Sequence, residues 1–282
     1  MSASPLISVA TLVPLLTDDR VVVFDCRHDL AKPGAGEQAY AISHLPGARF
    51  AHLDRNLSGP MTGRNGRHPL PDPAVFTAWL GTQGVSNQTR VIAYDGAGSS
   101  AYAARLWWML SRWLGHRDVL VLDGGWEAWA GSGQPVTAAP PTIKPVGFVA
   151  TADPATVVGA NDVLAAIGNP ALQLIDARAN DRFHGQNETI DPVAGHIPGA
   201  LNRVFRDNLD AAGFFKPAGE LRAGFESLIG TRPLGAIVHQ CGSGVTAAHN
   251  LLAMEIAGMT GTRLYPGSWS EWCADPARPV ER

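Results

Sequence analysis

Short apolar runs alternate along the chain with longer segments in which apolar and polar residues recur at helical spacing. Most of the short runs consist of valine, isoleucine and leucine, which is typical of strands buried in a parallel sheet. Residues 102–114 and 246–259 show the pattern of helices instead. This alternation predicts an α/β protein with an open, mainly parallel sheet that carries helices on both faces. The predicted strands are residues 21–24, 91–94, 119–122, 172–175 and 236–238.

The second half of the chain repeats motifs of the first half in the same order. The four matched pairs of segments are 21–27 with 172–178, 43–48 with 195–200, 91–98 with 237–244, and 125–129 with 268–272. Two tandem copies of one domain explain this order. We place the copies at residues 1–137 and 151–282. Between them, residues 138–150 contain several prolines, which restrict the backbone and predict a semi-rigid linker.

The composition is that of a folded protein with no charged or lipid-binding bias. Of the 282 residues, 45% are hydrophobic and 17% are charged, and the net charge is −3. The charge balance gives no basic surface for a nucleic acid, and no apolar run approaches the about 18 residues of a membrane span. We therefore expect neither nucleic acid nor membrane as a partner. The N-terminus carries no cationic leader and the three cysteines form no disulfide framework, so we expect the cytoplasm.

The segment at 237–246, which reads Ile-Val-His-Gln-Cys-Gly-Ser-Gly-Val-Thr, carries the clearest chemical signal. It joins a predicted strand to a predicted helix through a short loop with two glycines. Glycine allows a tight loop whose N–H groups point at one centre, and the helix adds its positive end to the same place. Both effects favour the thiolate form of Cys241 over the thiol. The same cradle suits a persulfide or an oxyanion.

Competing interpretations of this loop fit less well. A phosphate-binding P-loop needs Gly-Lys-Ser/Thr at its end, which is absent. A cysteine phosphatase needs an arginine six residues after the nucleophile, where this chain has Ala247. A purely structural role is the interpretation that we prefer for Cys26 and Cys273, but it is disfavoured for a cysteine at a glycine-rich turn. The nine histidines show no metal-ligand spacing, so we expect no metal and no cofactor.

The loop Cys-Gly-Ser-Gly-Val-Thr at 241–246, the paired His-x-Pro-Gly motifs and the duplication itself resemble the rhodanese superfamily. Within it, the neutral loop is similar to that of 3-mercaptopyruvate sulfurtransferases. Thiosulfate sulfurtransferases usually carry basic residues where this chain has Gly242 and Ser243. The resemblance implies tandem rhodanese-like domains, of which the first is inactive because Asp95 stands in the place of Cys241.

The resemblance also implies a reaction. Cys241 would take sulfane sulfur from 3-mercaptopyruvate as a persulfide, release pyruvate, and pass the sulfur to cyanide or to a thiol such as thioredoxin. The loop residues Gly242, Gly244, Val245 and Thr246 would hold the donor and the sulfur. Ser243, His68 and Asp54 are implied to polarise or protonate the leaving group, although an interdomain loop with incidental charge also explains His68 and Asp54.

Arginine is the natural partner of the donor's carboxylate. The family arginine that binds the donor matches Arg182, which could otherwise be a surface residue. A second family arginine, upstream of the second His-Ile-Pro-Gly, has no counterpart in residues 186–192. The basic, glycine-rich loop at 62–71 offers Arg67, and less clearly Arg64, as a replacement.

Two alternatives remain open at this point. The missing arginine favours a thiosulfate:cyanide sulfurtransferase, whereas the neutral loop argues against it. A non-catalytic persulfide carrier or sensor would load Cys241 once and release the sulfur only to a dedicated partner.

Overall fold

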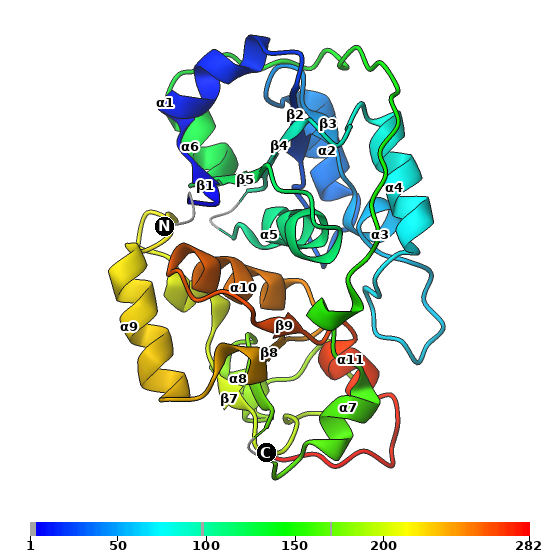
Figure 1. Ribbon diagram of the computed structural model, residues 1–282, viewed down its shortest axis with the longest axis vertical. Helices are drawn as coiled ribbons and strands as arrows, with labels where there is room; N and C mark the ends of the chain where they lie inside the picture. Colours follow the sequence, from blue (N-terminus) through cyan, green and yellow to red (C-terminus); the bar gives the residue numbers. More distant parts are fainter. Residues whose placement is uncertain (1–3, 97–98, 170) are drawn as a thin grey trace.

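The computed structural model describes residues 4–96, 99–169 and 171–282. They form two parallel β-sheets, one above the other in Figure 1, each with helices around it. The first sheet has the order β1-β5-β4-β2-β3 and the second has the order β7-β6-β8-β9. The strands are β1 (Leu6–Ile7), β2 (Val21–Asp25), β3 (Arg49–Phe50), β4 (Arg90–Tyr94), β5 (Val119–Leu122), β6 (Gln173–Asp176), β7 (Leu201–Asn202), β8 (Ile237–Gln240) and β9 (Arg263–Leu264).

The topology confirms the α/β fold that the sequence predicts. Within the described residues every paired strand runs parallel to its neighbour. The order β5-β4-β2-β3 of the first sheet corresponds to β9-β8-β6-β7 of the second, as the internal repeat requires. The carboxyl ends of β4 and β8 therefore occupy equivalent places, where ligands bind in open α/β sheets.

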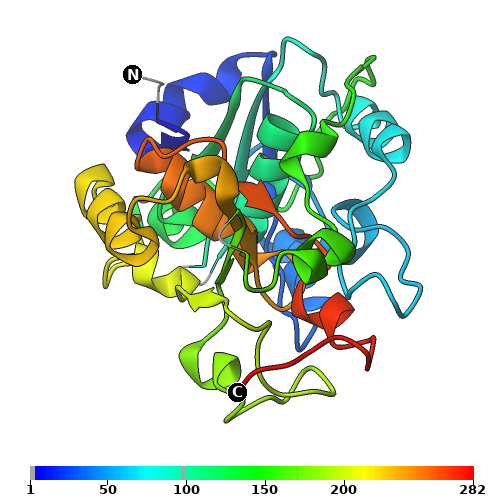
Figure 2. The ribbon, with the colours of Figure 1, turned by 60° about the horizontal axis from the view of Figure 1, so that its bottom comes forward.

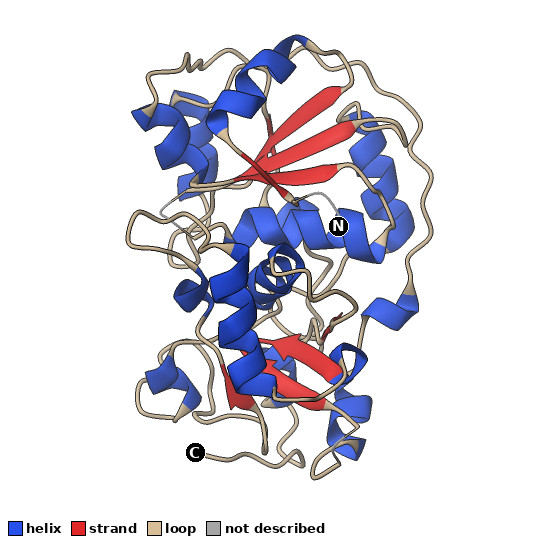
Figure 3. Cartoon of the chain, turned by 60° about the vertical axis from the view of Figure 1, so that its left-hand side comes forward, coloured by secondary structure: helices blue, strands red, loops and turns tan. Residues whose placement is uncertain are grey.

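Helices α5 and α10 lie side by side between the two sheets (Figures 1 and 3). Nearly every residue of both helices is buried, because each helix faces its own sheet on one side and the other helix on the opposite side. No helix in the described part of the chain combines the length and apolarity needed to cross a membrane. The helices are α1 (Val9–Leu12), α2 (Ala35–Ile42), α3 (Leu53–Asn56), α4 (Pro73–Thr82), α5 (Ala101–Trp108), α6 (Gly125–Gly131), α7 (Ala160–Ala165), α8 (Asn180–Phe183), α9 (Ala218–Ile229), α10 (Thr246–Ile256) and α11 (Ser268–Trp272).

The predicted limits of two helices need correction. The helix expected over 102–114 is α5 followed by a π-helical turn, Met109–Trp113. The wider turn places Trp113 in the core against Phe76. The helix expected over 246–259 ends at Ile256, because Gly258 adopts φ +70° and turns the chain back.

The segment 138–150 contains no helix or strand and runs along the first sheet's half of the molecule. The Val146 N–H donates to the Gly81 carbonyl at 3.0 Å, and the Asn87 side chain donates to the Val149 carbonyl at 2.6 Å. The Phe148 side chain is buried in the core. These contacts hold the proline-rich segment against one half of the molecule.

Candidate active site

Cys241 lies directly after the central strand β8 and is 2% exposed. Its Sγ accepts a hydrogen bond from the Gly244 N–H at 3.1 Å. Its own N–H donates to Ser268 Oγ, also at 3.1 Å. The helix α10 begins at Thr246, so its positive end faces the same loop. The sulfur therefore occupies a place where backbone dipoles favour negative charge.

The backbone of this loop depends on glycine and on α11. Gly244 adopts φ +78°, and a Cβ there would lie only 2.5 Å from the Pro266 carbonyl oxygen. The loop carbonyls of Cys241 and Gly242 accept hydrogen bonds of 2.9 Å from the Trp269 and Ser270 N–H groups. Because these carbonyls point toward α11, the loop N–H groups remain available to the sulfur and to a group bound to it.

Ser243, His68 and Asp54 form a connected chain of polar side chains. Ser243 Oγ lies 2.7 Å from His68 Nδ1, and His68 Nε2 lies 3.3 Å from Asp54 Oδ1. Burial, followed by the charge of Arg105, lowers the pKa of His68 to about 4. His68 is therefore neutral at pH 7, with one ring nitrogen able to donate and the other able to accept.

This chain of side chains connects the two halves of the molecule. His68 and Asp54 come from the first half, and Ser243 comes from the Cys241 loop. The loop that carries His68 is fixed beside α11, since the Arg67 N–H donates to Ser270 Oγ at 3.0 Å (Figure 2). The structure thus brings together three residues that are far apart in the sequence.

Arg182 and Arg67 lie over the same loop. A Cβ on Gly242 would be 2.9 Å from Arg67 Nη2 and 3.8 Å from both terminal nitrogens of Arg182. Arg182 donates to Glu188 at 2.9 Å and to Asp191 at 3.1 Å, and Arg67 pairs with Asp191. Both carboxylate side chains are 2% exposed. Two cations and two buried anions therefore line the approach to Cys241.

Sequence analysis missed the two carboxylates and one further cation. Arg105 of α5 is fully buried, and its Nη1 donates to the Gly244 carbonyl at 3.1 Å. The available signal was a single arginine within the apolar segment 103–110, which reads Ala-Ala-Arg-Leu-Trp-Trp-Met-Leu. A charge in such a segment needs a buried partner.

Comparison with known proteins identifies the fold family. A model of the rhodanese-like domain matches residues 8–132 and 159–275. This chain belongs to the rhodanese family. It is 46% identical to a Pseudomonas aeruginosa protein named "probable 3-mercaptopyruvate sulfurtransferase", over 99% of both chains. It is 38% identical to a bovine thiosulfate sulfurtransferase, over 85% of this chain and 81% of that one. The crystal structure of a 3-mercaptopyruvate sulfotransferase from Escherichia coli aligns with a TM-score of 0.80 and 32% identity, covering 95% of this chain and 99% of that one.

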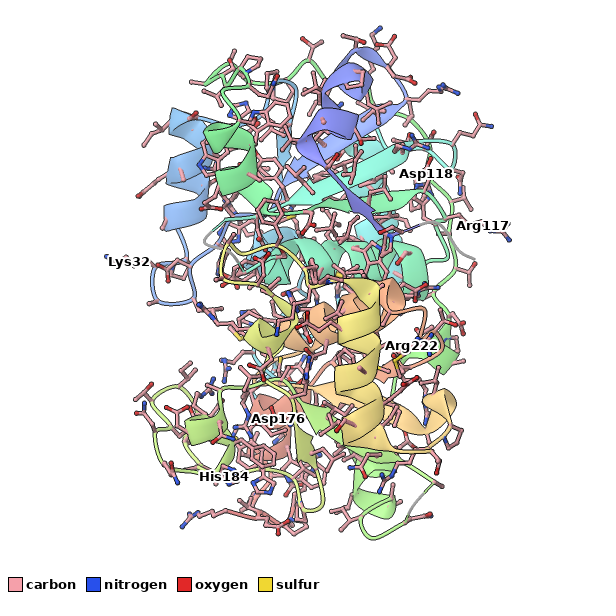
Figure 4. The ribbon with its side chains drawn as sticks, turned by 90° about the vertical axis from the view of Figure 1, so that its left-hand side faces the viewer. Lys32, Arg117, Asp118, Asp176, His184 and Arg222 are labelled. Atoms are coloured by element: carbon pink, nitrogen blue, oxygen red, sulfur yellow. The ribbon has the colours of Figure 1, made fainter. Side chains whose placement is uncertain are left out.

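Several residues that recur in both rhodanese-like domains are structural. In each copy an aspartate ends a strand and pairs with the arginine two residues later (Figure 4 labels Asp176). That arginine also lies over a tryptophan ring, at 4.2 Å in the first copy and 4.7 Å in the second. The repeated arginines and tryptophans therefore hold the strand ends. The two sets are Asp25, Arg27 and Trp126, and Asp176, Arg178 and Trp269.

Three potential metal ligands also meet beside the site, although the spacing of the histidines did not indicate them. One ligand atom each of His28, His52 and Asp54 lies within 4.8 Å of the others. His52 Nδ1 already accepts the Asp54 N–H at 3.1 Å, and the Asp54 carboxylate faces His68. These contacts explain the positions of His52 and Asp54, while His28 packs edge-on against His52 and Tyr102. We assign no metal to the cluster.

Proposed function

We propose that this rhodanese-family chain is a sulfurtransferase that moves sulfane sulfur from 3-mercaptopyruvate to a thiol or to cyanide through a persulfide on Cys241. The supporting observation is the Gly244 N–H, which lies 3.1 Å from Cys241 Sγ in a loop at the start of α10. This arrangement suits a sulfur nucleophile and stabilises the persulfide anion that follows.

The first half-reaction balances without a cofactor. The Cys241 thiolate attacks the thiol sulfur of 3-mercaptopyruvate and forms the S–S bond. The C–S bond of the donor breaks, and its electron pair remains on carbon as the enolate of pyruvate. The proton of the donor thiol is released as the persulfide ionises, and the enolate takes up one proton. A thiol or cyanide then attacks the outer sulfur and regenerates the thiolate.

Ser243 and His68 are suited to stabilise and protonate the enolate. The Ser243 hydroxyl can donate to the developing oxyanion while neutral His68, 2.7 Å away, exchanges a proton with it. Asp54 would hold the His68 ring in the required orientation. In this proposal, each half of the chain contributes part of the proton pathway.

The charges around the loop favour mercaptopyruvate over thiosulfate. Arg182 and Arg67 offer two guanidinium groups to the donor's carboxylate, and Arg67 takes the place of the missing second arginine of the family. Glu188 and Asp191 balance their charge, so the approach carries little net positive potential. A singly charged carboxylate suits this approach better than the dianion of thiosulfate.

Intact-protein mass spectrometry after mixing with 3-mercaptopyruvate tests the proposal. We expect the wild-type protein to gain the mass of one sulfur atom, and Cys241→Ser to gain none while it remains folded. Cys26→Ser serves as the matched control and should load like the wild type. A wild-type protein that stays unmodified by 3-mercaptopyruvate would contradict the proposal.

One observation favours a second candidate function. No arginine occupies residues 186–192, where the mercaptopyruvate branch carries one, and this supports a thiosulfate:cyanide sulfurtransferase. A kcat/KM for thiosulfate above that for mercaptopyruvate would select this alternative. A protein that loads once and stalls with small acceptors would instead be a persulfide carrier.

We further propose a cytoplasmic location and a protein thiol such as thioredoxin as the acceptor. All three cysteines are free, which suits a reducing compartment. The division into an inactive domain at 1–137, a linker at 138–150 and a catalytic domain at 151–282 belongs to the same proposal. Turnover with reduced thioredoxin above that with cyanide would support the choice of acceptor.

A further inference from the structure

Arg105 is a buried cation that lies between the two halves of the active site. It belongs to α5 in the first domain, and α5 packs against α10 (Figure 1). Its side chain is fully buried. Burying an unpaired guanidinium is strongly unfavourable, so its position requires a compensating negative charge or a dense set of acceptors.

The hydrogen bonds of Arg105 connect the two parts of the site to each other. Nη1 donates to the Gly244 carbonyl at 3.1 Å, and Nη2 donates to the His68 carbonyl at 2.9 Å and the Leu57 carbonyl at 3.3 Å. One guanidinium thus contacts the residue whose N–H binds Cys241 Sγ and the residue whose ring binds Ser243. Nε is buried and has no hydrogen-bond partner.

The other arginines around the loop all have carboxylate partners. Arg178 pairs with Asp176, and Arg182 and Arg67 pair with the acids at 188 and 191. His68, the remaining titratable group that contacts Arg105, is neutral at pH 7. All the hydrogen bonds that Arg105 makes within the described residues go to main-chain carbonyls.

The Cys241 loop brings a compensating charge close to Arg105, because the residue whose carbonyl accepts from Arg105 Nη1 at 3.1 Å, Gly244, also donates its N–H to Cys241 Sγ at 3.1 Å. Burial lowers the pKa of Arg105 to about 10, and the negative charge of Cys241 opposes this change. At pH 7 the guanidinium is therefore still protonated. The same positive charge helps to keep His68 neutral, because it is the second cause, after burial, of the lowered pKa of His68. A single cation thus favours an anionic sulfur and an uncharged imidazole.

We propose that Arg105 is a positioning residue whose guanidinium is the counter-charge of the Cys241 sulfur, both as thiolate and as persulfide, and aligns the His68 and Gly244 segments across the domain boundary. This inference rests on the proposed use of Cys241 as the sulfur-carrying nucleophile. It assigns to the inactive domain an electrostatic contribution in addition to His68, Asp54 and Arg67. Arg105 does not touch the donor and acts through the sulfur and the two segments that it bonds.

The rate of Cys241 alkylation by iodoacetamide, followed against pH, tests this proposal without any sulfur donor. The label is read on the peptide that contains Cys241, because Cys26 and Cys273 are also free. In Arg105→Met and Arg105→Gln, we expect the midpoint of the rate–pH curve to rise by about one unit, with about tenfold slower alkylation at pH 7. Arg105→Lys keeps the charge and should shift the midpoint much less.

Arg49→Met is the matched control. Arg49 lies in the first domain, is partly buried, and likewise donates to the main-chain carbonyls of Gln83 and Gly47. Its loss should leave the alkylation curve of Cys241 unchanged. An unshifted midpoint in folded Arg105→Met, or an equal shift in Arg49→Met, overturns the proposal. Because no donor is present, failure of the wild type to accept sulfur from mercaptopyruvate would contradict the proposed function and leave this result intact.

A second measurement decides the matter if the neutral variants do not fold. In a Cys241→Ser background the counter-charge is gone, so Arg105→Met should be tolerated better than in the wild-type protein. Thermal melts of the wild type, both single variants and the double variant show whether loss of Cys241 restores a folding transition to Arg105→Met. Recovery of folding in the double variant supports the proposal. Equal damage in both backgrounds means that Arg105 supports only the fold, and it overturns the proposal.

Discussion

In each domain the central strand, β4 or β8, is followed by a loop and a helix whose N–H groups point at one side chain. We call this arrangement the cradle, and the two domains place different side chains in it. After β4, the carboxylate of Asp95 accepts the N–H groups of Tyr102 and Ala103 at 2.8 and 3.1 Å. After β8, Cys241 Sγ accepts the Gly244 N–H. The first cradle therefore holds the protein's own anion, and the second presents a sulfur. Residues 97 and 98, which end the first copy of this motif, lie outside the described residues.

The electrostatic surroundings of the two cradles differ as much as their contents. Burial raises the pKa of Asp95 to about 7, and nearby Glu127 adds to the effect. Burial also raises the pKa of Cys26, with Asp95 and Asp25 acting in the same direction. The second cradle instead receives Arg105, Arg67 and His68 from the other domain. The comparison shows how the copy without the cysteine contributes side chains to the loop that carries Cys241 in the other copy.

The largest loss of activity is expected from a change in the backbone of the Cys241 loop. In Gly244→Ala the new Cβ meets the Pro266 carbonyl at 2.5 Å and Arg105 Nη1 at 3.1 Å, and the backbone would leave φ +78°. The N–H donor to Cys241 Sγ is displaced, so we expect kcat with mercaptopyruvate to fall by about 10²- to 10³-fold. Steady-state kinetics measure this change.

The control for this variant is Gly47→Ala in the first domain. Gly47 adopts φ +76°, but a Cβ there meets no atom within 4 Å. It should lower stability by about 1 kcal/mol and leave kcat unchanged. If kcat fell equally in both variants, the loop geometry at Gly244 would not be the cause of the loss.

The next largest effect is expected from a change at His68, which distinguishes protonation of the enolate from binding of the sulfur. His68→Gln should lower kcat with mercaptopyruvate by about 10²-fold, because the enolate needs a proton from the Ser243 side. Thiosulfate releases sulfite, which leaves as an anion, so its turnover should change little. Parallel kinetics with both donors give the ratio, and Gln83→Ala, on the surface of the same domain, is the control. A uniform loss with both donors would indicate that His68 only positions the loop.

A smaller effect is expected from the arginine that the first domain supplies. Arg67→Met removes one guanidinium near Gly242 and leaves Arg182 in place, so KM for mercaptopyruvate should rise by about tenfold with kcat nearly retained. Arg64→Met in the same loop is the matched control and should change KM little. If Arg64→Met raised KM as much as Arg67→Met, the loop would act through its overall charge.

The smallest effect on activity is expected for Asp95→Asn, which should leave turnover unchanged and alter stability instead. The pKa of Asp95 is raised from 3.8 to about 7 in the folded protein, so its contribution to stability is present below pH 4 and is lost as the pH rises through 7. The variant should lack this loss, which we expect to be about 4 kcal/mol.

Denaturant unfolding of both proteins between pH 4 and 8 measures the difference. His239 and His249, whose pKa values burial lowers to about 3, change stability in the opposite direction in both proteins and cancel in the comparison. If the stability of the wild type and of Asp95→Asn depended on pH in the same way, the N–H groups around Asp95 would fully offset the effect of burial on its pKa.

Local patterns predicted the five longer strands and the glycine-rich loop after β8, but not the two-residue strands β1, β3, β7 and β9. Residues 236–238 are apolar enough to predict a central strand, which the structure places at Ile237–Gln240, and the glycines at 242 and 244 indicate the loop that follows. Helix ends were less accurate, because the π-helical turn at Met109–Trp113 depends on packing against Phe76. Local propensity contains no information on that contact.

The cations around Cys241 show the limit of sequence reasoning more sharply. Arg182 follows from its motif, but the pairing of Arg67 with Asp191 joins residues from different domains and has no local signal. The same holds for Arg105 and Gly244. Such contacts depend on how α5 and α10 pack, which no window of sequence contains.

The amino-acid sequence by itself determined the duplicated α/β architecture, the cysteine at a glycine-rich turn and the loss of that cysteine from the first copy. These features depend on hydrophobic period and on backbone freedom, which act over a few residues. The tertiary structure decided which charges surround the sulfur. Asp54, His68 and Arg105 lie beside Ser243 and Gly244 only because the first domain packs against the second, and electrostatic interactions depend on distance in space rather than along the chain.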